Sequence, residues 1–79
     1  LYTLAEHQST PDRWMPFRLL KYMLRVMERH LQETQGQTLP VVYPLVFYHG
    51  QARYNYSTDI IDLFDDPELA QGILFKPFQ

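Results

Sequence analysis

The sequence predicts an α/β fold in which a strand, a long helix and a second strand are followed by short helical segments. Three patterns predict it. Residues 2–8 alternate between two faces, residues 17–31 repeat apolar side chains at spacings of three and four, and residues 39–48 form a nearly continuous apolar run. A strand–helix–strand unit favours a parallel strand pair joined by a right-handed crossover.

The first strand, residues 2–8, delivers polar side chains to its carboxyl end. Glu6 and Gln8 lie on one face, and His7 lies on the other. A carboxylate on the inner half of a strand is costly unless it is paired or bound to a metal. Glu6 and Gln8 are therefore candidate site residues. The alternative is that they mark only the solvated end of the strand.

The long helix is predicted to begin at residues 10–12, Thr-Pro-Asp, and to run to about Gln35. Pro16 conflicts with that start, because proline removes a backbone hydrogen bond and kinks a helix. We expect either a kink between Asp12 and Pro16 or a short turn followed by the main helix from Pro16. Gly36 is the predicted left-handed residue at the helix end.

A narrow basic stripe is expected along one edge of this helix. At about 100° per residue its members fall side by side next to the apolar arc. A basic stripe of this kind can contact nucleic-acid phosphates, or it can be a solvated face. Its four members are Arg18, Lys21, Arg25 and Arg29.

The second strand, residues 39–48, is apolar enough to be covered on both faces. Pro44 within it indicates a sheet edge or a bulge. A short turn capped by Ser57 or Thr58 is expected over residues 59–64. A short helix is expected from Pro67 to about Gln71, with further structure beginning at residues 73–75.

Five of the nine acidic residues fall within residues 59–68. Their spacing does not match a calcium-binding loop, which needs a central glycine and a terminal bidentate glutamate. Helix capping and turn formation account for most of them. We therefore interpret this acidic segment as structural.

Composition excludes several classes of protein. The chain has no cysteine, so disulfides and sulfur-based zinc sites are absent, as suits a cytoplasmic protein. No apolar run approaches the roughly 20 residues of a membrane span. The sequence also contains no phosphate-binding glycine loop, no G-x-S-x-G elbow and no H-E-x-x-H motif.

An ordered series of sequence blocks resembles the recombination-promoting nucleases, also called putative transposases, of the PD-(D/E)XK nuclease superfamily. The resemblance spans nearly all 79 residues. The blocks are LAEHQS at 4–9, PD at 11–12, MPFRLL at 15–20, PLVFYHG at 44–50, STD at 57–59 and DLF at 62–64.

This resemblance implies a restriction-endonuclease-like core and magnesium-dependent cleavage of DNA. Glu6 matches the acidic member of the (D/E)-x-K motif, and Gln8 stands where the superfamily usually has lysine. His7 is the intervening residue, whose main-chain carbonyl typically ligates the metal. The helix after the motif strand often lies near DNA, so the basic stripe is the expected DNA contact.

Residues 1–79 are expected to form a single incomplete nuclease-like domain, a partial restriction-endonuclease-like core. The aspartate that the superfamily carries on the preceding strand has no counterpart here, and the chain also stops without a helix cap or a tail. We expect such a piece to be inactive alone. The alternatives are a catalytically inactive remnant that binds DNA or associates with a longer copy of the same protein, and a purely structural fragment.

Overall fold

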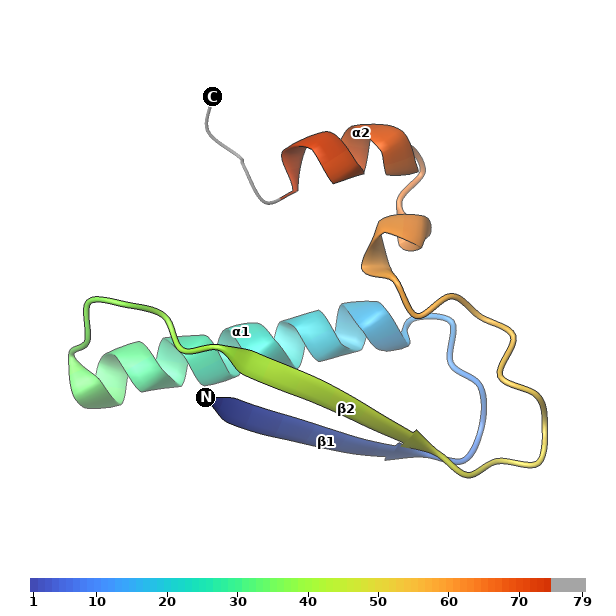
Figure 1. Ribbon diagram of the computed structural model, residues 1–79, viewed down its shortest axis with the longest axis horizontal. Helices are drawn as coiled ribbons and strands as arrows, with labels where there is room; N and C mark the ends of the chain where they lie inside the picture. The colour runs from blue at the N-terminus through green and yellow to red at the C-terminus, as the bar shows by residue number, and fades with distance from the viewer. Residues whose placement is uncertain (75–79) are drawn as a thin grey trace.

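The computed structural model describes residues 1–74 and confirms the predicted order of elements (Figure 1). Strand β1, Tyr2–Gln8, leads to helix α1, Met15–Thr34, and then to strand β2, Val42–Tyr48. A 3₁₀ turn η1, Ile60–Leu63, and helix α2, Pro67–Ile73, follow. The structure expected to begin at residues 73–75 lies partly outside the described residues.

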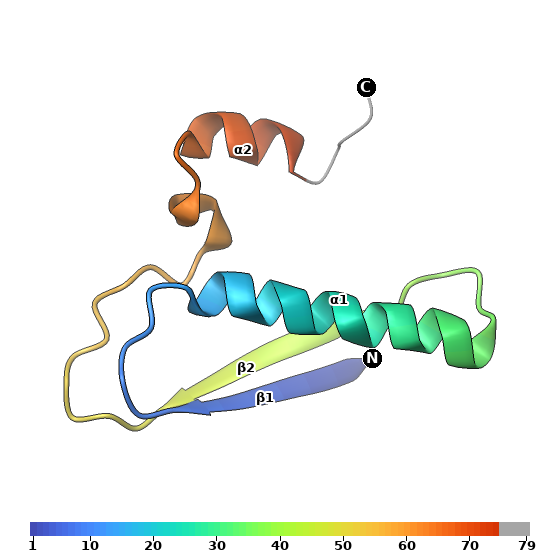
Figure 2. The same ribbon diagram turned by 180° about the vertical axis from the view of Figure 1, so that it is seen from behind.

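The two strands pair in parallel, as predicted, and their carboxyl ends lie together. The register runs without interruption from Tyr2 opposite Val42 to Gln8 opposite Tyr48. Helix α1 lies along one face of this sheet, here called the inner face, and the other is the outer face (Figure 2). The loops that leave both strands therefore emerge at the same end of the sheet, next to the beginning of α1 (Figure 1).

Pro44 lies in a regular strand without a bulge. In this register, odd-numbered positions of β2 bond to β1: the Val41 carbonyl accepts from Tyr2, and the His49 N–H donates to Gln8. The missing N–H of Pro44 therefore falls on the side of β2 that faces away from β1. Pro44 was predicted to mark either a sheet edge or a bulge, and within the described residues the sheet edge is confirmed.

Helix α1 begins later than residues 10–12, so that prediction is wrong. Residues 13–14 form a turn that the Met15 N–H closes by donating to the Asp12 carbonyl, and the helix starts at Met15 with Pro16 in its first turn. Pro16 lacks an N–H donor, which is harmless only at a helix start. The expectation of a short turn followed by the main helix is thus confirmed.

The end of α1 also differs from the prediction. Gln35, with φ of 50°, occupies the left-handed position, and its N–H donates to the Leu31 carbonyl. Gly36 is not left-handed. A nonglycine residue takes this conformation at a modest cost, which the helix-terminal hydrogen bond offsets.

The core of the described residues is small. Its buried side chains are Met15, Pro16, Val42 and Ala70, and each of the three nonproline members keeps a few per cent of its exposure. Helix α1 carries a broad apolar arc, and the two-stranded sheet covers only part of it. Phe17 and Leu24, both in that arc, are accordingly 48% and 51% exposed.

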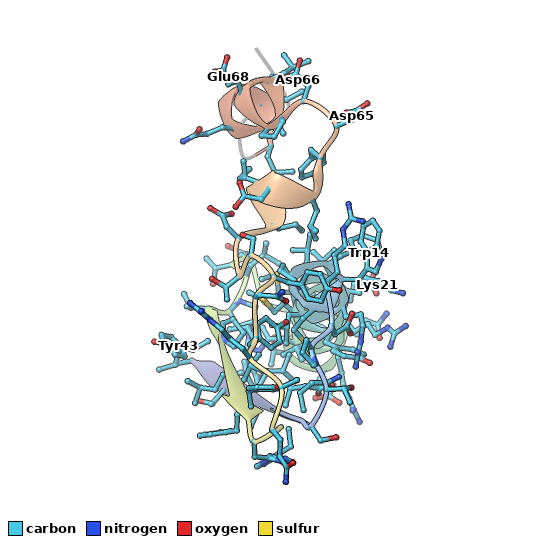
Figure 3. All side chains as sticks on the ribbon, turned by 90° about the vertical axis from the view of Figure 1, so that its right-hand side faces the viewer. Trp14, Lys21, Tyr43, Asp65, Asp66 and Glu68 are labelled. Atoms are coloured by element: carbon cyan, nitrogen blue, oxygen red, sulfur yellow. The ribbon has the colours of Figure 1, made fainter. Side chains whose placement is uncertain are left out.

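The prediction that β2 is covered on both faces is wrong for residues 1–74. Tyr43, Leu45 and Phe47 alternate onto the outer face and are all exposed. Figure 3 shows Tyr43 projecting on the side of the sheet opposite Trp14 and Lys21. An apolar run predicts where a strand forms, but its neighbours decide which face is covered.

The segment after β2 folds through side-chain caps. Asp59, rather than Ser57 or Thr58, caps η1 by accepting a hydrogen bond from the Ile61 N–H at 3.0 Å. Ser57 supports that cap, because its hydroxyl accepts from the Asp59 N–H at 3.1 Å. Helix α2 begins at Pro67 as predicted and extends to Ile73, two residues past Gln71.

We predict that Asp66→Ala destabilises α2. The Asp66 carboxylate accepts from the Leu69 N–H at 3.2 Å, and without it a helix-terminal donor loses its partner. The expected cost is about 1 kcal/mol of unfolding free energy, measured by denaturant titration. Asp65→Ala is the matched control, because Asp65 is an exposed neighbour outside the cap. Equal losses in the two variants would contradict the capping role.

Candidate active site

Glu6 lies on the inner face of β1, near the end where both strands finish. Leu4, Glu6 and Gln8 share one face of the strand, as predicted. In the structure this is the inner face, and all three side chains are half-buried there. The Glu6 side chain retains 24% of its exposure. It faces helix α1 rather than open solvent, so the reading of residues 6–8 as only the solvated end of a strand is too simple.

Arg18 joins two carboxylates that are distant in sequence. Its Nη2 donates to Glu6 Oε1 at 3.0 Å, and its Nη1 donates to Asp12 Oδ2 at 2.5 Å. The hydrogen bond to Asp12 is the largest influence raising the pKa of the Arg18 guanidinium. Arg18 therefore stays cationic and neutralises the half-buried Glu6.

Asp12 is itself held by four hydrogen bonds, one of which its main-chain carbonyl accepts from the Met15 N–H at 3.3 Å. Its Oδ1 accepts from the Trp14 N–H at 2.9 Å, while Oδ2 accepts from Arg18. The Tyr54 hydroxyl donates to the Asp12 main-chain carbonyl at 2.7 Å. The loop after β2 is thereby fastened to the turn before α1. Asp12 anchors Arg18 with both of its carboxylate oxygens engaged.

Asp12 was predicted as part of a helix start, and its contact with Arg18 was not predicted. A turn residue followed six positions later by an arginine has no recognised pairing rule, unlike the i,i+4 spacing of Arg29 and Glu33. Only the fold brings Glu6, Asp12 and Tyr54 to one place. Pro16 could have predicted this turn position of Asp12, because proline is favoured in the first turn of a helix and so places Asp12 in the segment before the helix.

His7 lies on the outer face, where its ring stacks on Phe47 with centroids 5.2 Å apart. His49 lies nearby, with its ring centroid 6.1 Å from that of His7. Even-numbered residues of β1 use their main-chain groups to bond β2, as the bonds of Tyr2 and Gln8 show. The His7 carbonyl therefore points away from β2 and is not consumed by that ladder.

Gln8 ends the strand beside the exit of β2. Its main-chain carbonyl accepts from the His49 N–H at 3.0 Å, which ties the two strand ends together. A methyl group on Gly50 would lie 2.0 Å from the Ser9 carbonyl oxygen, so only glycine allows this approach. The Gln8 side chain remains half-buried on the same face as Glu6.

The structure divides the predicted basic stripe. Arg18 turns toward Glu6 and Asp12, whereas the other three cations are exposed. Lys21 Nζ lies 5.7 Å from the Phe17 ring centroid, and Arg25 Cζ lies 5.6 Å from that of Tyr22. Arg29 pairs with Glu33 at 3.0 Å. Lys21 projects from α1 on the side away from Tyr43 (Figure 3).

The acidic segment does not form a metal centre among residues 1–74. No group of three or more histidine, cysteine or acidic side chains is placed to hold an ion anywhere in residues 1–74, around Glu6 included. Asp65, Asp66 and Glu68 gather around the beginning of α2, far from Tyr43 and the sheet (Figure 3). Asp59 and Asp66 are caps, so the structural interpretation of this segment is confirmed for both.

The oxygen donors around Glu6 are of the kind that a magnesium-type cation uses, and residues 1–74 supply one of the carboxylates that such a site needs. Magnesium usually keeps several waters and uses only one or two carboxylates. Within residues 1–74, Glu6 Oε2 has no hydrogen-bond partner, and the His7 carbonyl is free of β2. Both are hard oxygen donors. Glu6 and the His7 carbonyl are thus the residues that would hold such an ion.

An apolar hollow of about 320 Å³ opens between α1 and the inner face of β2. Met15 and Leu19 line it from the helix, Val46 and Tyr48 from the strand, and Tyr54 from the following loop. Val46 and Tyr48 are the partners of Glu6 and Gln8 in the sheet register. The candidate site therefore has one charged side, at Glu6 and Arg18, and one apolar side.

Comparisons with known proteins agree on one family. A family model described as "Putative transposase, YhgA-like" matches residues 1–79. Three proteins of Escherichia coli (strain K12) are similar over 99% of this chain: the inactive recombination-promoting nuclease-like protein RpnE at 42% identity, and the recombination-promoting nucleases RpnA at 42% and RpnC at 43%. The chain spans about a quarter of their lengths, 26%, 27% and 26% respectively.

No solved structure matches the chain. Among the described residues, no helix combines the length and apolar character needed to cross a membrane.

Proposed function

Because the chain belongs to the YhgA-like putative transposase family, we propose that it is part of a metal-dependent DNA endonuclease domain of the PD-(D/E)XK type. The observation that carries this proposal is the placement of Glu6. Its carboxylate is half-buried on the inner face, at the end of the sheet where both strands finish. The family match over residues 1–79 and the nuclease names of the relatives support it.

Each residue has a distinct role in this proposal. Glu6 and the His7 carbonyl would hold a magnesium ion, whose chemistry would be to activate a water and to neutralise charge at the scissile phosphate. Gln8 lies two residues beyond Glu6 on the same face and orients the attacking water. It acts as a hydrogen-bonding group only, since an amide does not titrate as a base.

The exposed cations Lys21, Arg25 and Arg29 are the proposed contacts to the DNA backbone. They lie on one helix whose first turn carries Arg18 and reaches the candidate site, so a duplex along α1 would bring a phosphate toward Glu6. Contacts of this kind position DNA without reading its sequence. Cytoplasmic location, where the substrate lies, is part of the same proposal.

The direct test is a plasmid-cleavage assay on the extended chain, meaning residues 1–79 with the adjoining coding sequence in the same reading frame. Magnesium-dependent cleavage by the extended chain supports the proposal, and its absence would contradict it. Identity alone does not decide the matter, because the relative named inactive and the nuclease RpnA are both 42% identical to this chain. DNA binding or self-association without cleavage would instead favour the inactive remnant.

We predict that replacing Lys21, Arg25 and Arg29 with glutamine, one at a time, weakens DNA binding without changing sequence preference. Each lost phosphate contact should lower the slope of log K against log salt by about 1. The measurement is DNA affinity across a salt series. Arg53→Gln is the matched control, because Arg53 is a cation in the loop after β2. An unchanged slope in all three helix variants would identify the stripe as a solvated face.

A further inference from the structure

Arg18 differs from the other cations of the stripe. Its side chain is 35% exposed, whereas that of Arg29 is 79% exposed. It is also the member that contacts two carboxylates, Glu6 from β1 and Asp12 from the turn. A guanidinium already engaged by two carboxylates is poorly available to a DNA phosphate.

The two carboxylates that Arg18 contacts are used differently. Both oxygens of Asp12 are occupied, one by the Trp14 N–H and one by Arg18. Arg18 engages only Oε1 of Glu6 and leaves Oε2 without a partner among residues 1–74. Asp12 thus fixes the guanidinium, and the guanidinium fixes one oxygen of Glu6.

We propose that Arg18 is a positioning residue that holds the Glu6 carboxylate by Oε1, so that Oε2 is presented to a divalent cation. This inference rests on the proposed function and replaces a DNA-phosphate role for Arg18. A glutamate side chain loses conformational entropy when it becomes ordered. Because Arg18 already orders Glu6 in the metal-free protein, metal binding does not have to lose that entropy again. Residues that orient a metal ligand typically contribute about 10- to 100-fold in metal affinity.

The geometry requires arginine rather than any cation. A planar guanidinium presents separate N–H groups to two carboxylates at once, whereas a lysine ammonium is a point charge. Arg18→Lys therefore keeps the positive charge, which repels a metal ion, but removes the planar guanidinium that orients Glu6. A lower metal affinity in this variant would therefore come from the lost orientation of Glu6 and not from a change in charge.

The test is the affinity of the extended chain for Mn²⁺, measured by titration calorimetry without DNA. Mn²⁺ suits the same oxygen ligands as magnesium. Glu6→Ala defines the binding that depends on this site. Arg18→Lys should weaken that binding about tenfold. Arg25→Lys, on the same helix and without a carboxylate partner among the described residues, should change it less than about twofold.

A second variant tests the chain of contacts. Asp12→Asn keeps an acceptor for Trp14 but removes the charge that anchors Arg18, and it should weaken Mn²⁺ binding to a similar extent. Because Asp12 acts through Arg18, the variant that carries both Asp12→Asn and Arg18→Lys should bind Mn²⁺ as tightly as the weaker-binding of the two single variants. Circular dichroism of each variant checks that it is folded. If Arg18→Lys fails to fold, Asp12→Asn alone carries the test.

Three results would overturn the inference. They are equal Mn²⁺ affinities in the Arg18→Lys and Arg25→Lys variants, no Glu6-dependent Mn²⁺ binding in the wild type, and an Arg18→Gln variant whose DNA salt slope falls by about 1. Failure of the nuclease proposal is a separate result. An extended chain that binds Mn²⁺ in an Arg18-dependent manner but cleaves no DNA supports the inference and contradicts the proposed function.

Discussion

Glu6→Ala is expected to lower magnesium-dependent cleavage by the extended chain about a hundredfold or more, because it removes the side-chain ligand of the proposed metal site. The affinity for DNA should change little, since Glu6 is a half-buried acid and not a phosphate contact. The measurements are the initial rate of plasmid cleavage and DNA binding by fluorescence anisotropy. Cleavage at the wild-type rate in this variant would show that Glu6 is not a residue of the active site.

The control for this experiment must separate lost chemistry from lost structure. Glu6→Ala also leaves Arg18 with Asp12 as its one carboxylate partner among residues 1–74, which can destabilise the fold. Glu6→Gln keeps the shape and a hydrogen-bond acceptor for Arg18 but lacks the charge that a magnesium ion requires. Both variants should therefore lose cleavage, while Glu6→Gln keeps the thermal midpoint closer to wild type.

Gly50→Ala is expected to destabilise the chain by about 1–3 kcal/mol of unfolding free energy. The added methyl group would lie 2.0 Å from the Ser9 carbonyl oxygen and 2.6 Å from the Tyr48 hydroxyl. Since the Ser9 carbonyl is backbone, the two loops must separate. Ser9 directly follows Gln8, so cleavage by the extended chain should also fall, by about 10- to 100-fold for a displacement near 1 Å.

Gly72→Ala is the matched control for Gly50→Ala. Gly72 lies in α2, and a methyl group there would meet no atom within 4 Å. Alanine in a helix is favoured over glycine by about 0.5–1 kcal/mol, so this variant should be neutral or slightly stabilised. Denaturant titration compares the two variants. A Gly50→Ala variant as stable as Gly72→Ala would show that the loops do not need their close approach.

The sequence predicted those parts of the fold that depend on local pattern. The alternation of residues 2–8 predicted β1 and the face that carries Glu6, and Pro67 predicted the beginning of α2. These features persist because side-chain periodicity and proline geometry act within a few residues. The predicted helix start was several residues too early, because residues 10–12 also have the composition of a helix N-terminus. Only Pro16 indicated a later start.

The partners of Glu6 required the tertiary structure. Arg18 was predicted as one member of a uniform basic stripe, because spacing along a helix gives direction but not the neighbour on the opposite element. The exposure of Phe17 and Tyr43 was likewise not predictable, since covering a face depends on how many elements pack against it. Both features concern contacts between segments distant in sequence.

By itself, the sequence determined the order of strands and helices, the placement of Glu6 and Gln8 on one face of the first strand, and a family resemblance that comparison confirmed. The tertiary structure alone decided that Arg18 bridges Glu6 and Asp12, and that Gly50 lies against Ser9. The physical reason is that periodicity fixes which face a residue occupies, whereas ion pairs and close backbone approaches exist only after the turn, the helix and the two strand ends have met.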